Sequence, residues 1–288
     1  MQKIPGILKL HKKLFFLYPF AFKSHRLPEN CLAWISSSSF SKWIPKPRGA
    51  RFVCYCHTPP RYFWNPDEYL ENEIGNPILR KMVRALMPLF RWSDRRQAQK
   101  VDLFLANSEN VQKRIHECYG RESTVVYPPV DVERFQVGEK TEDFFLIVTR
   151  LVAYKRIDLA VNAFTRTGQN LVIIGDGPAR ARLEAMAGPT VQFLGRAPDK
   201  TVTEKMATCR GYIFPGGALE TVIENETGVF FDEPNEESLV GALKEFEKID
   251  WDKSVIRRNA ERFSTAAFLK HTYEILGSMS KHAAEPAT

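Results

Sequence analysis

The sequence predicts an α/β protein built on doubly wound parallel sheets. Short apolar runs that resemble buried strands alternate along the chain with longer segments whose apolar residues recur at helical spacing. Strands and helices that alternate in this order favour parallel sheets covered by helices. The 288 residues have room for one large domain or two ordinary ones, and 44% hydrophobic with 26% charged residues is typical of a globular protein.

The first half of the chain contains four predicted strands and two long predicted helices. The strands cover 32–36, 51–56, 101–106 and a stretch that begins near 124; the helices cover 77–98 and 109–118. Pro88 predicts a kink in the first helix. Asn107 and Ser108 offer an N-cap for the second. The strand and Pro-stiffened segment at 124–135 are typical of a domain linker.

The second half repeats the alternation more regularly. The predicted strands cover 144–149, 171–175, 191–195 and 211–214. The helices between them cover 156–166, 178–187 and 201–208. Three further helices are predicted over 236–248, 252–262 and 265–278. Pro178 suits the first position of its helix. No internal repeat interrupts this pattern.

Two cations stand at the first strand-to-helix junction of this second half. Arg150 and Lys155 follow the apolar run 144–149 and precede the predicted helix. Ligands of open α/β sheets bind outside the carboxyl ends of the strands, and a helix amino terminus attracts anions. The pair therefore suggests a diphosphate clamp. The alternative, two solvated residues at the start of a helix, is about equally favoured by spacing alone.

Charge is concentrated toward the amino terminus. Residues 1–130 carry 21 Lys and Arg against 10 Asp and Glu, whereas the rest carries 20 against 24. The first 51 residues contain ten basic residues and one acid, interleaved with Phe15, Phe16, Tyr18, Phe20, Phe22 and Trp34. This composition suits an anionic membrane surface, and equally an ordinary basic surface around a partly buried aromatic cluster. No nucleic-acid motif accompanies it.

Cysteine usage and hydropathy argue against a disulfide scaffold, a metal site and a transmembrane helix. Five scattered cysteines fit a reducing cytoplasm better than a disulfide scaffold. Cys54, Cys56 and His57 form a C-x-C-H sequence, but no second Cys/His pair lies at ligand spacing, so no metal site is predicted. There is no run of about 18 apolar residues, which excludes a transmembrane helix, and the apolar run at 14–22 lacks a signal-peptide cleavage site.

Three segments together resemble a bacterial family-4 retaining glycosyltransferase of the two-domain GT-B type. They are CYCHTPPRYFW at 54–64, VDLFLANSENVQKRIHECYG…VVYPPVDVERF at 101–135 and RLVAYKRIDLAVNAF…LVIIGDGP…VQFLG at 150–195. The resemblance covers roughly residues 30–280. It is nearest to the mannosyltransferases and other hexosyltransferases that build surface polysaccharide, and it implies two Rossmann-like domains.

The resemblance implies site residues in both domains. Arg150 and Lys155 are expected to hold the donor diphosphate, with the loop Gly175, Asp176 and Gly177 beside the donor. His57 is expected to be a catalytic residue that lies near the transferred sugar. The alternative is a histidine that only packs its loop beside Pro59. Side chains expected to contact acceptor or donor sugar are Arg61, Tyr62 and Trp64, for which loop packing is equally favoured.

The chain departs from the family pattern in two places. The family's Glu-x7-Glu segment, which follows the strand ending in Phe-Pro, is absent, because 211–216 runs directly into 217–231. The spacing recurs only at Glu109/Glu117 and Glu237/Glu245, within predicted helices. The opening strand and Gly-rich loop of the family are also absent. We therefore expect an incomplete N-terminal domain, and a C-terminal domain shortened by about one helix and one strand.

The sequence thus predicts an incomplete acceptor-side domain over 1–135, a nucleotide-sugar-binding domain over 136–262 and a C-terminal helix and tail over 263–288. The expected reaction is hexose transfer, mannose-like, from a nucleotide-diphosphate sugar to a lipid-linked or polysaccharide acceptor at the cytoplasmic side of the membrane. No cofactor, metal or nucleic acid is expected. The alternatives are a noncatalytic relative with weak nucleotide-diphosphate binding and, from another class, a basic membrane-surface adaptor.

Overall fold

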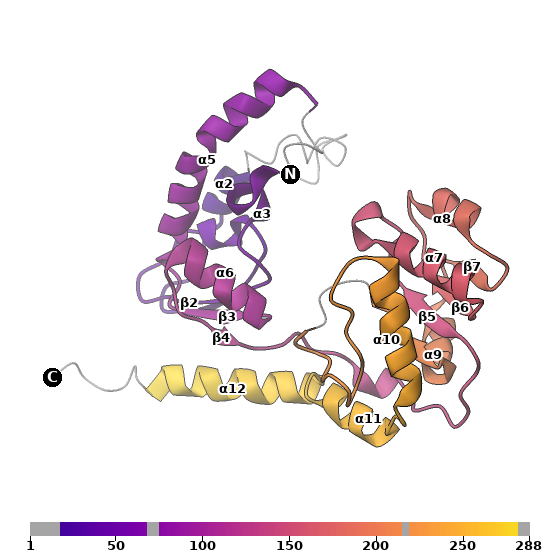
Figure 1. Ribbon diagram of the computed structural model, residues 1–288. Helices are drawn as coiled ribbons and strands as arrows, with labels where there is room; N and C mark the ends of the chain where they lie inside the picture. Colours follow the sequence, from indigo (N-terminus) through magenta and orange to yellow (C-terminus); the bar gives the residue numbers. More distant parts are fainter. Residues whose placement is uncertain (1–17, 68–74, 215–218, 282–288) are drawn as a thin grey trace. The chain divides into compact units, whose positions relative to one another are not determined.

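The computed structural model describes residues 18–67, 75–214 and 219–281 (Figure 1). The chain divides into two compact units, Met1–Pro128 and Pro129–Thr288. Each unit contains a four-stranded sheet whose strands are all parallel within the described residues. The predicted α/β class with two parallel sheets is confirmed.

The N-terminal unit has its strands in sequence order, β1-β2-β3-β4. Its elements are α2 Tyr18–Lys23, β1 Leu32–Ser37, η2 Phe40–Trp43, β2 Arg51–Cys56, α3 Arg61–Trp64, α5 Pro77–Ala98, β3 Leu103–Ala106, α6 Glu109–Tyr119 and β4 Thr124–Val125. Phe52, Cys54 and Phe104 lie on one face of the sheet and pack against Ala98 of α5 and Ile115 of α6. Because alternate strand residues share a face, this core follows directly from the apolar runs.

A buried ion pair joins η2 to α5 in this unit. The Lys42 ammonium lies 2.9 Å from Asp94 Oδ1, and the two side chains are 1% and 0% exposed. The other carboxylate oxygen accepts hydrogen bonds from Trp64 Nε1 at 3.0 Å and Tyr119 Oη at 2.8 Å. Burial works to lower the pKa of Lys42, but the charge of Asp94, with smaller contributions from neighbouring thiols, outweighs it and the pKa is raised.

The C-terminal unit has the strand order β7-β6-β5-β8. Its elements are η3 Val132–Arg134, β5 Phe145–Val148, η4 Ala153–Lys155, α7 Ile157–Thr167, β6 Leu171–Ile174, α8 Arg180–Met186, β7 Val191–Gly195, α9 Asp199–Thr208, β8 Gly211–Tyr212, α10 Glu236–Lys248, α11 Lys253–Glu261 and α12 Thr265–Lys281. On one face Phe145 and Ile147 pack with Phe164 of α7 and Leu243 of α10.

The opposite face of this sheet has a core of its own. Leu146 and Ile174 pack with the half-buried Val202 and Met206 of α9. Residues 145 and 147 therefore face one layer of helices while 146 faces the other, as the period of two in a strand requires. An almost continuous apolar run was the sequence signal for a strand covered on both faces, and the structure confirms it.

Several predicted boundaries were wrong. Pro178 does not open α8, because Ala179 N still donates to Leu151 O at 3.1 Å and the helix begins only at Arg180. The predicted strand 211–214 narrows to the two residues of β8. The described residues 219–235, between β8 and α10, contain turns and one isolated bridge, Glu224 to Gly228, rather than a helix or strand.

The Pro-stiffened segment that follows β4 packs on the C-terminal unit. Val130 N donates to Phe263 O at 2.8 Å, and Arg257 Nη1 donates to the carbonyls of Val132 and Phe135 at 2.9 and 2.8 Å. The contacts of the chain change units between Pro128 and Pro129. The predicted domain limits at 135 and 262 stay predictions.

Candidate functional site

The carboxyl ends of four parallel strands gather several loops at one edge of the C-terminal sheet. The loop 149–156 follows β5, 175–179 follows β6, Arg196 follows β7 and Phe214 lies just beyond β8. This is the edge at which open α/β sheets bind ligands. The predicted clamp and donor-side loop, from separate parts of the sequence, both lie there.

Arg150 and Lys155 both lack an acidic partner among the described residues. Arg150 is exposed, and neither a hydrogen bond nor an ion pair of its guanidinium is recorded in the described part of the chain. Lys155 is half-buried at the end of η4. Its ammonium lies 5.7 Å from the ring centre of Tyr154 and 5.3 Å from that of Phe214. Aromatic faces attract a cation without neutralising it, so both charges stay available to an anion.

The turn from η4 into α7 is made by a residue with a left-handed backbone. Arg156 has φ 49° and serves as the N-cap of α7, but its side chain makes no capping hydrogen bond. Its guanidinium instead lies 3.3 Å from Asp158. Most non-glycine residues avoid this region of φ. The α7 amino terminus, with its positive dipole end, therefore begins directly after Lys155 and has no side-chain cap.

Gly175 and Gly177 allow two loops of the chain to touch. A Cβ at Gly175 would overlap the carbonyl oxygen of Thr149, and one at Gly177 that of Leu151. Gly175 also has φ 145°, which L side chains rarely adopt. Leu151 N donates to Asp176 O at 3.1 Å across the same contact. The close approach that these glycines allow is to the loop bearing Arg150.

Asp176 fixes its own loop. Its Oδ1 accepts a hydrogen bond from Gly177 N at 2.9 Å, and its Oδ2 lies 3.6 Å from Arg196 Nε. Arg196 is 87% exposed at the end of β7. The carboxylate therefore has a partner, and Arg196 adds a third cation to this edge that the sequence had not singled out.

His57 lies at the carboxyl end of β2, in the other unit. Its Nε2 is 2.9 Å from Ser36 Oγ, its backbone N donates to Ser37 O at 2.8 Å, and its ring packs edge-on against Tyr55. The ring is otherwise exposed. Ser36, which the sequence analysis missed as a partner, comes from the neighbouring parallel strand.

The residues that follow His57 are mostly used within the N-terminal unit. The Tyr62 hydroxyl contacts Ser39 Oγ and its ring packs on Phe40. Trp64 donates its indole N–H to Asp94, and Arg95 lies over its ring at 5.5 Å. Arg61 begins α3 and is exposed. The structure thus gives Tyr62 and Trp64 packing roles within the N-terminal unit.

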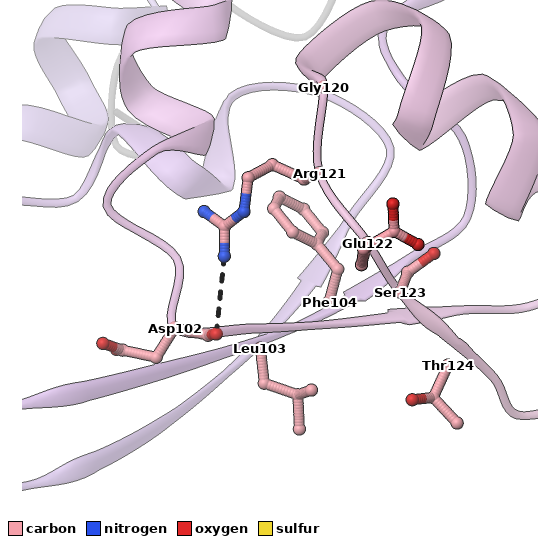
Figure 2. Close-up of a pocket in the computed structure, with 8 residues that line it drawn as sticks. All are labelled: Asp102, Leu103, Phe104, Gly120, Arg121, Glu122, Ser123 and Thr124. Carbon is pink, nitrogen blue, oxygen red and sulfur yellow. Dashed lines mark hydrogen bonds between the residues drawn. The ribbon is translucent and has the colours of Figure 1, made fainter.

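An open pocket lies at the opposite, amino-terminal end of the N-terminal sheet. Figure 2 shows its lining, residues 102–104 and 120–124. Its cation, Arg121, donates to the carbonyls of Ala98 at 3.1 Å and Asp102 at 3.5 Å and lies over the Phe104 ring. The guanidinium is therefore already engaged, and no predicted site residue lines this pocket.

The C-x-C-H sequence contributes to a hydrophobic core. Cys54 and Cys56 are 0% and 1% exposed, whereas His57 points out of the sheet edge. Burial raises the pKa of the Cys56 thiol to about 12, so at neutral pH it carries its proton. Across the described residues no group of three or more His, Cys, Asp or Glu side chains is placed to hold a metal ion.

Two family models match consecutive parts of the chain. Residues 32–134 match Glycosyltransferase Family 4, and residues 129–216 match Glycosyl transferases group 1. Together the matches extend over well more than half of the 288 residues. The chain belongs to the family-4, group 1 glycosyltransferases. The predicted family, and with it a hexosyltransferase identity at the level of the family, is confirmed.

Several solved structures share the fold of this family-4 chain. The lipopolysaccharide outer core galactosyltransferase WaaB is 15% identical with a TM-score of 0.56, covering 86% of this chain and 99% of its own. HepE of Anabaena, in complex with UDP and glucose, is 14% identical with a TM-score of 0.55, and the match covers 85% of this chain and 92% of HepE. TarM is 13% identical with a TM-score of 0.62, and the match covers 90% of this chain and 57% of TarM. These likenesses show the GT-B fold. Among curated proteins no significant match was found.

Within the described residues no helix combines the length and the apolar character that a membrane span requires.

Proposed function

We propose that this glycosyltransferase moves a hexose from a nucleotide-diphosphate sugar to a lipid-linked or polysaccharide acceptor in cell-surface polysaccharide biosynthesis. The observation that carries the proposal is that the side chains of Arg150 and Lys155 are not paired with an acid in the described chain. Both cations lie at the carboxyl edge of the C-terminal sheet without an acidic partner in the described chain. Cations that evolution leaves uncompensated beside a helix amino terminus suit a ligand that brings its own negative charge.

The chemistry of sugar transfer needs such a pair. The bond between the anomeric carbon and the diphosphate oxygen breaks through an oxocarbenium-like state, and negative charge grows on the leaving phosphate. Arg150 and Lys155 would bind the diphosphate in the ground state and stabilise the added charge in the transition state. The glycine loop supports this arrangement indirectly, because Gly175 and Gly177 pack against the segment that bears Arg150.

The remaining roles are assigned from the resemblance. His57, oriented by Ser36, is proposed to bond a hydroxyl of the transferred sugar or to support the developing charge. Arg61 is proposed as an acceptor-side contact, as are Tyr62 and Trp64 through their remaining exposed edges. In domain terms, 1–135 is proposed as the acceptor side, 136–262 as the nucleotide-sugar side, and 263–288 as the C-terminal helix and tail.

The donor is proposed to be a nucleoside-diphosphate hexose, with a mannose-like sugar expected from the resemblance. HepE was solved with UDP and glucose, TarM of S. aureus with UDP, and WaaB is described as a galactosyltransferase. These relatives support a uridine nucleotide and a hexose in general. Binding tests should therefore include UDP and GDP, and transfer tests should include glucose, galactose and mannose donors.

One observation favours a noncatalytic relative as a second candidate. The segment in which the family carries its glutamate pair is occupied here by turns over 219–235, and residues 215–218 lie outside the described part of the chain. Glu224 uses its Oε1 to accept the backbone N–H of Phe230 at 3.2 Å. Glu237 and Glu245, at the family spacing, lie on α10 beside Arg166 and Lys248. Each of these three carboxylates therefore already has a partner within the protein.

Calorimetry with UDP and GDP tests the proposed diphosphate site. We expect weak but measurable binding that falls at least about tenfold in Arg150→Ala and in Lys155→Ala, since a charge-assisted hydrogen bond contributes about 1.5–3 kcal/mol. Lys200→Ala, which removes an exposed cation of the same unit, should leave the affinity unchanged. Equal affinities in all four proteins would overturn the assignment.

Release of nucleoside diphosphate from the donor panel separates the two candidate functions. Turnover should be slow, because the glutamates that would hold the donor's hydroxyls are missing, and it should fall further in His57→Ala. Binding that depends on Arg150 and Lys155 without any release, even with added acceptor glycolipid, would favour the noncatalytic relative. Fast release would exclude it.

A further inference from the structure

The helix α5 exposes a stripe of large apolar side chains. Six of them are between 49% and 71% exposed: Ile78, Leu79, Met82, Leu86, Leu89 and Trp92. Successive members are mostly three or four residues apart, so they share one side of the helix. We call these six residues the α5 stripe. A contiguous exposed apolar surface of this kind marks an interaction site more often than a solvated face.

The stripe is not the core-facing side of the helix. The buried residues of α5 are Met87, Asp94, Gln97 and Ala98, all from Met87 onward, and Met87, Asp94 and Ala98 lie on the side opposite the stripe. Residues 77–86 contain no buried side chain. Figure 1 shows this amino-terminal half of α5 running away from the sheet of its unit. The helix thus has two apolar sides, of which only one has a partner within the described unit.

The charges on α5 are almost all of one sign. The helix carries Arg80, Lys81, Arg84, Arg91, Arg95 and Arg96, and its single acid, Asp94, is buried against Lys42. At helical spacing, all of these cations except Arg96 lie between the stripe and the core-facing side, and Arg96 lies over the Trp92 ring at 5.6 Å. Arg84 is paired with Asp67 at the surface, and Arg91 and Arg95 donate to backbone carbonyls of the unit but keep their charge. An apolar stripe beside a basic flank, with a Trp among the apolar residues, is the pattern of a helix that lies in the plane of a membrane interface.

We propose that the α5 stripe docks on an anionic lipid surface, with its apolar side chains in the acyl boundary and the basic flank on the headgroups. Charge complementarity selects this occupant. A second copy of the chain would oppose one basic flank to another. The segment 1–17 is also basic, with four lysines and no acid, so it too would bring like charge to the helix.

The proposed membrane contact lies on α5 and not on the segment 1–51, whose composition suggested an anionic membrane surface. The basic and aromatic residues of 1–51 were the sequence signal, and residues 1–17 lie outside the described part of the chain. The inference extends the proposed function, because a lipid-linked acceptor would lie in the surface that α5 contacts. Its test needs no donor or nucleotide, so its failure and that of the proposed function can be told apart.

Vesicle sedimentation tests the proposal. We expect the full chain to bind vesicles of phosphatidylcholine with 30% phosphatidylglycerol, as a typical anionic mixture, at least about tenfold more tightly than pure phosphatidylcholine, and salt to weaken the binding. Ile78→Ser/Met82→Ser/Leu89→Ser should reduce binding at least about tenfold. Lys81→Gln/Arg84→Gln should reduce both binding and its salt dependence.

Two control variants test whether the effect belongs to α5. Leu269→Ser/Tyr273→Ser, which removes exposed apolar side chains of α12, should bind as the wild type does. Phe15→Ser/Phe16→Ser tests the sequence-based alternative. Loss of binding in that variant but not in the stripe variant would overturn the proposal, as would a wild type that ignores anionic lipid.

Fluorescence gives a readout that survives a folding defect in the triple variant. Vesicles with brominated acyl chains should quench the wild type, and Trp92→Phe should lose the greater part of that quenching while still sedimenting with the vesicles. Unchanged quenching in Trp92→Phe would contradict docking through α5. Stripe-dependent dimers in sedimentation velocity, with no vesicle binding, would show that a second copy covers the stripe instead.

Discussion

At the scale of the residue, Asp94 shows how much depends on one buried carboxylate. It receives the Lys42 ammonium and the donors of Trp64 and Tyr119. Burying a charge is costly unless it is paired and hydrogen-bonded, and here both conditions hold. The sequence signal was only a single acid within a basic helix, and helical spacing gave no reason to pair it with a lysine 52 positions earlier.

We expect Asp94→Asn to destabilise the N-terminal unit by about 3–5 kcal/mol, because it leaves the Lys42 charge buried without an anionic partner, with only the Ser39 carbonyl to accept from it. Urea unfolding followed by circular dichroism measures this. Glu245→Gln breaks the exposed pair with Lys248 and should change stability by no more than about 0.5 kcal/mol. The double variant Lys42→Met/Asp94→Asn should be more stable than Asp94→Asn. If it is not, the unpaired lysine is not the cause.

At the scale of the element, the sequence offered two candidate N-caps for α6, and the structure shows which of them is used. The sequence offered Asn107 and Ser108 as caps, and Ser108 Oγ accepts from Val111 N at 3.2 Å while Asn107 stays outside the helix. Gly120, with φ 63°, ends the same helix in the left-handed conformation. Both ends of α6 are thus determined by the residues that directly flank it.

Ser108→Ala should lower the stability of the N-terminal unit by about 1 kcal/mol, the usual contribution of an N-cap. Ser108→Asp restores an acceptor and adds a negative charge at the positive end of the helix dipole, so it should recover most of the loss. Asn107→Ala serves as the comparison. Thermal or urea unfolding that finds Asn107→Ala the more damaging would show that the cap is assigned to the wrong residue.

The helix α5 was predicted from its apolar periodicity, but which of its sides is buried was not. Its apolar residues predicted a helix over 77–98, and its limits are confirmed. The pattern of Ile78, Met82 and Leu86 would ordinarily mark the buried side, yet these residues are exposed. Periodicity reports that a helix is amphipathic. It does not report whether the partner of the apolar side is the protein's own core or something outside it.

At the scale of the whole molecule, the buried thiols and phenols predict sensitivity to alkali. Burial raises the pKa of Cys56 to about 12, and it raises the pKa of Cys54 and Tyr119 as well. Above about pH 9 the unfolded chain releases thiol protons that the folded chain retains. The stability that these groups contribute is therefore complete below pH 9 and is lost as the pH rises toward the folded pKa values.

We expect the urea midpoint under reducing conditions to change little between pH 7 and 8.5 and to fall steeply between pH 9 and 10.5. Each fully buried thiol adds a slope of about 1.4 kcal/mol per pH unit in that range. Cys54→Ala/Cys56→Ala should flatten the fall, whatever it does to stability at neutral pH. A midpoint that falls as steeply in this variant would assign the alkaline transition to other groups.

The sequence by itself determined the order of elements, the two parallel sheets and the family, because apolar periodicity, caps and loop motifs act over a few neighbouring residues. It also placed Arg150 and Lys155 at the end of a strand. Tertiary structure alone decided which charges stay free. The Asp94 carboxylate is paired with Lys42, the Arg121 guanidinium donates to the Ala98 carbonyl and Gly175 packs against Thr149, whereas Arg150 has no acidic partner among the described residues. Burial and long-range pairing depend on the packed chain, and no local pattern encodes them.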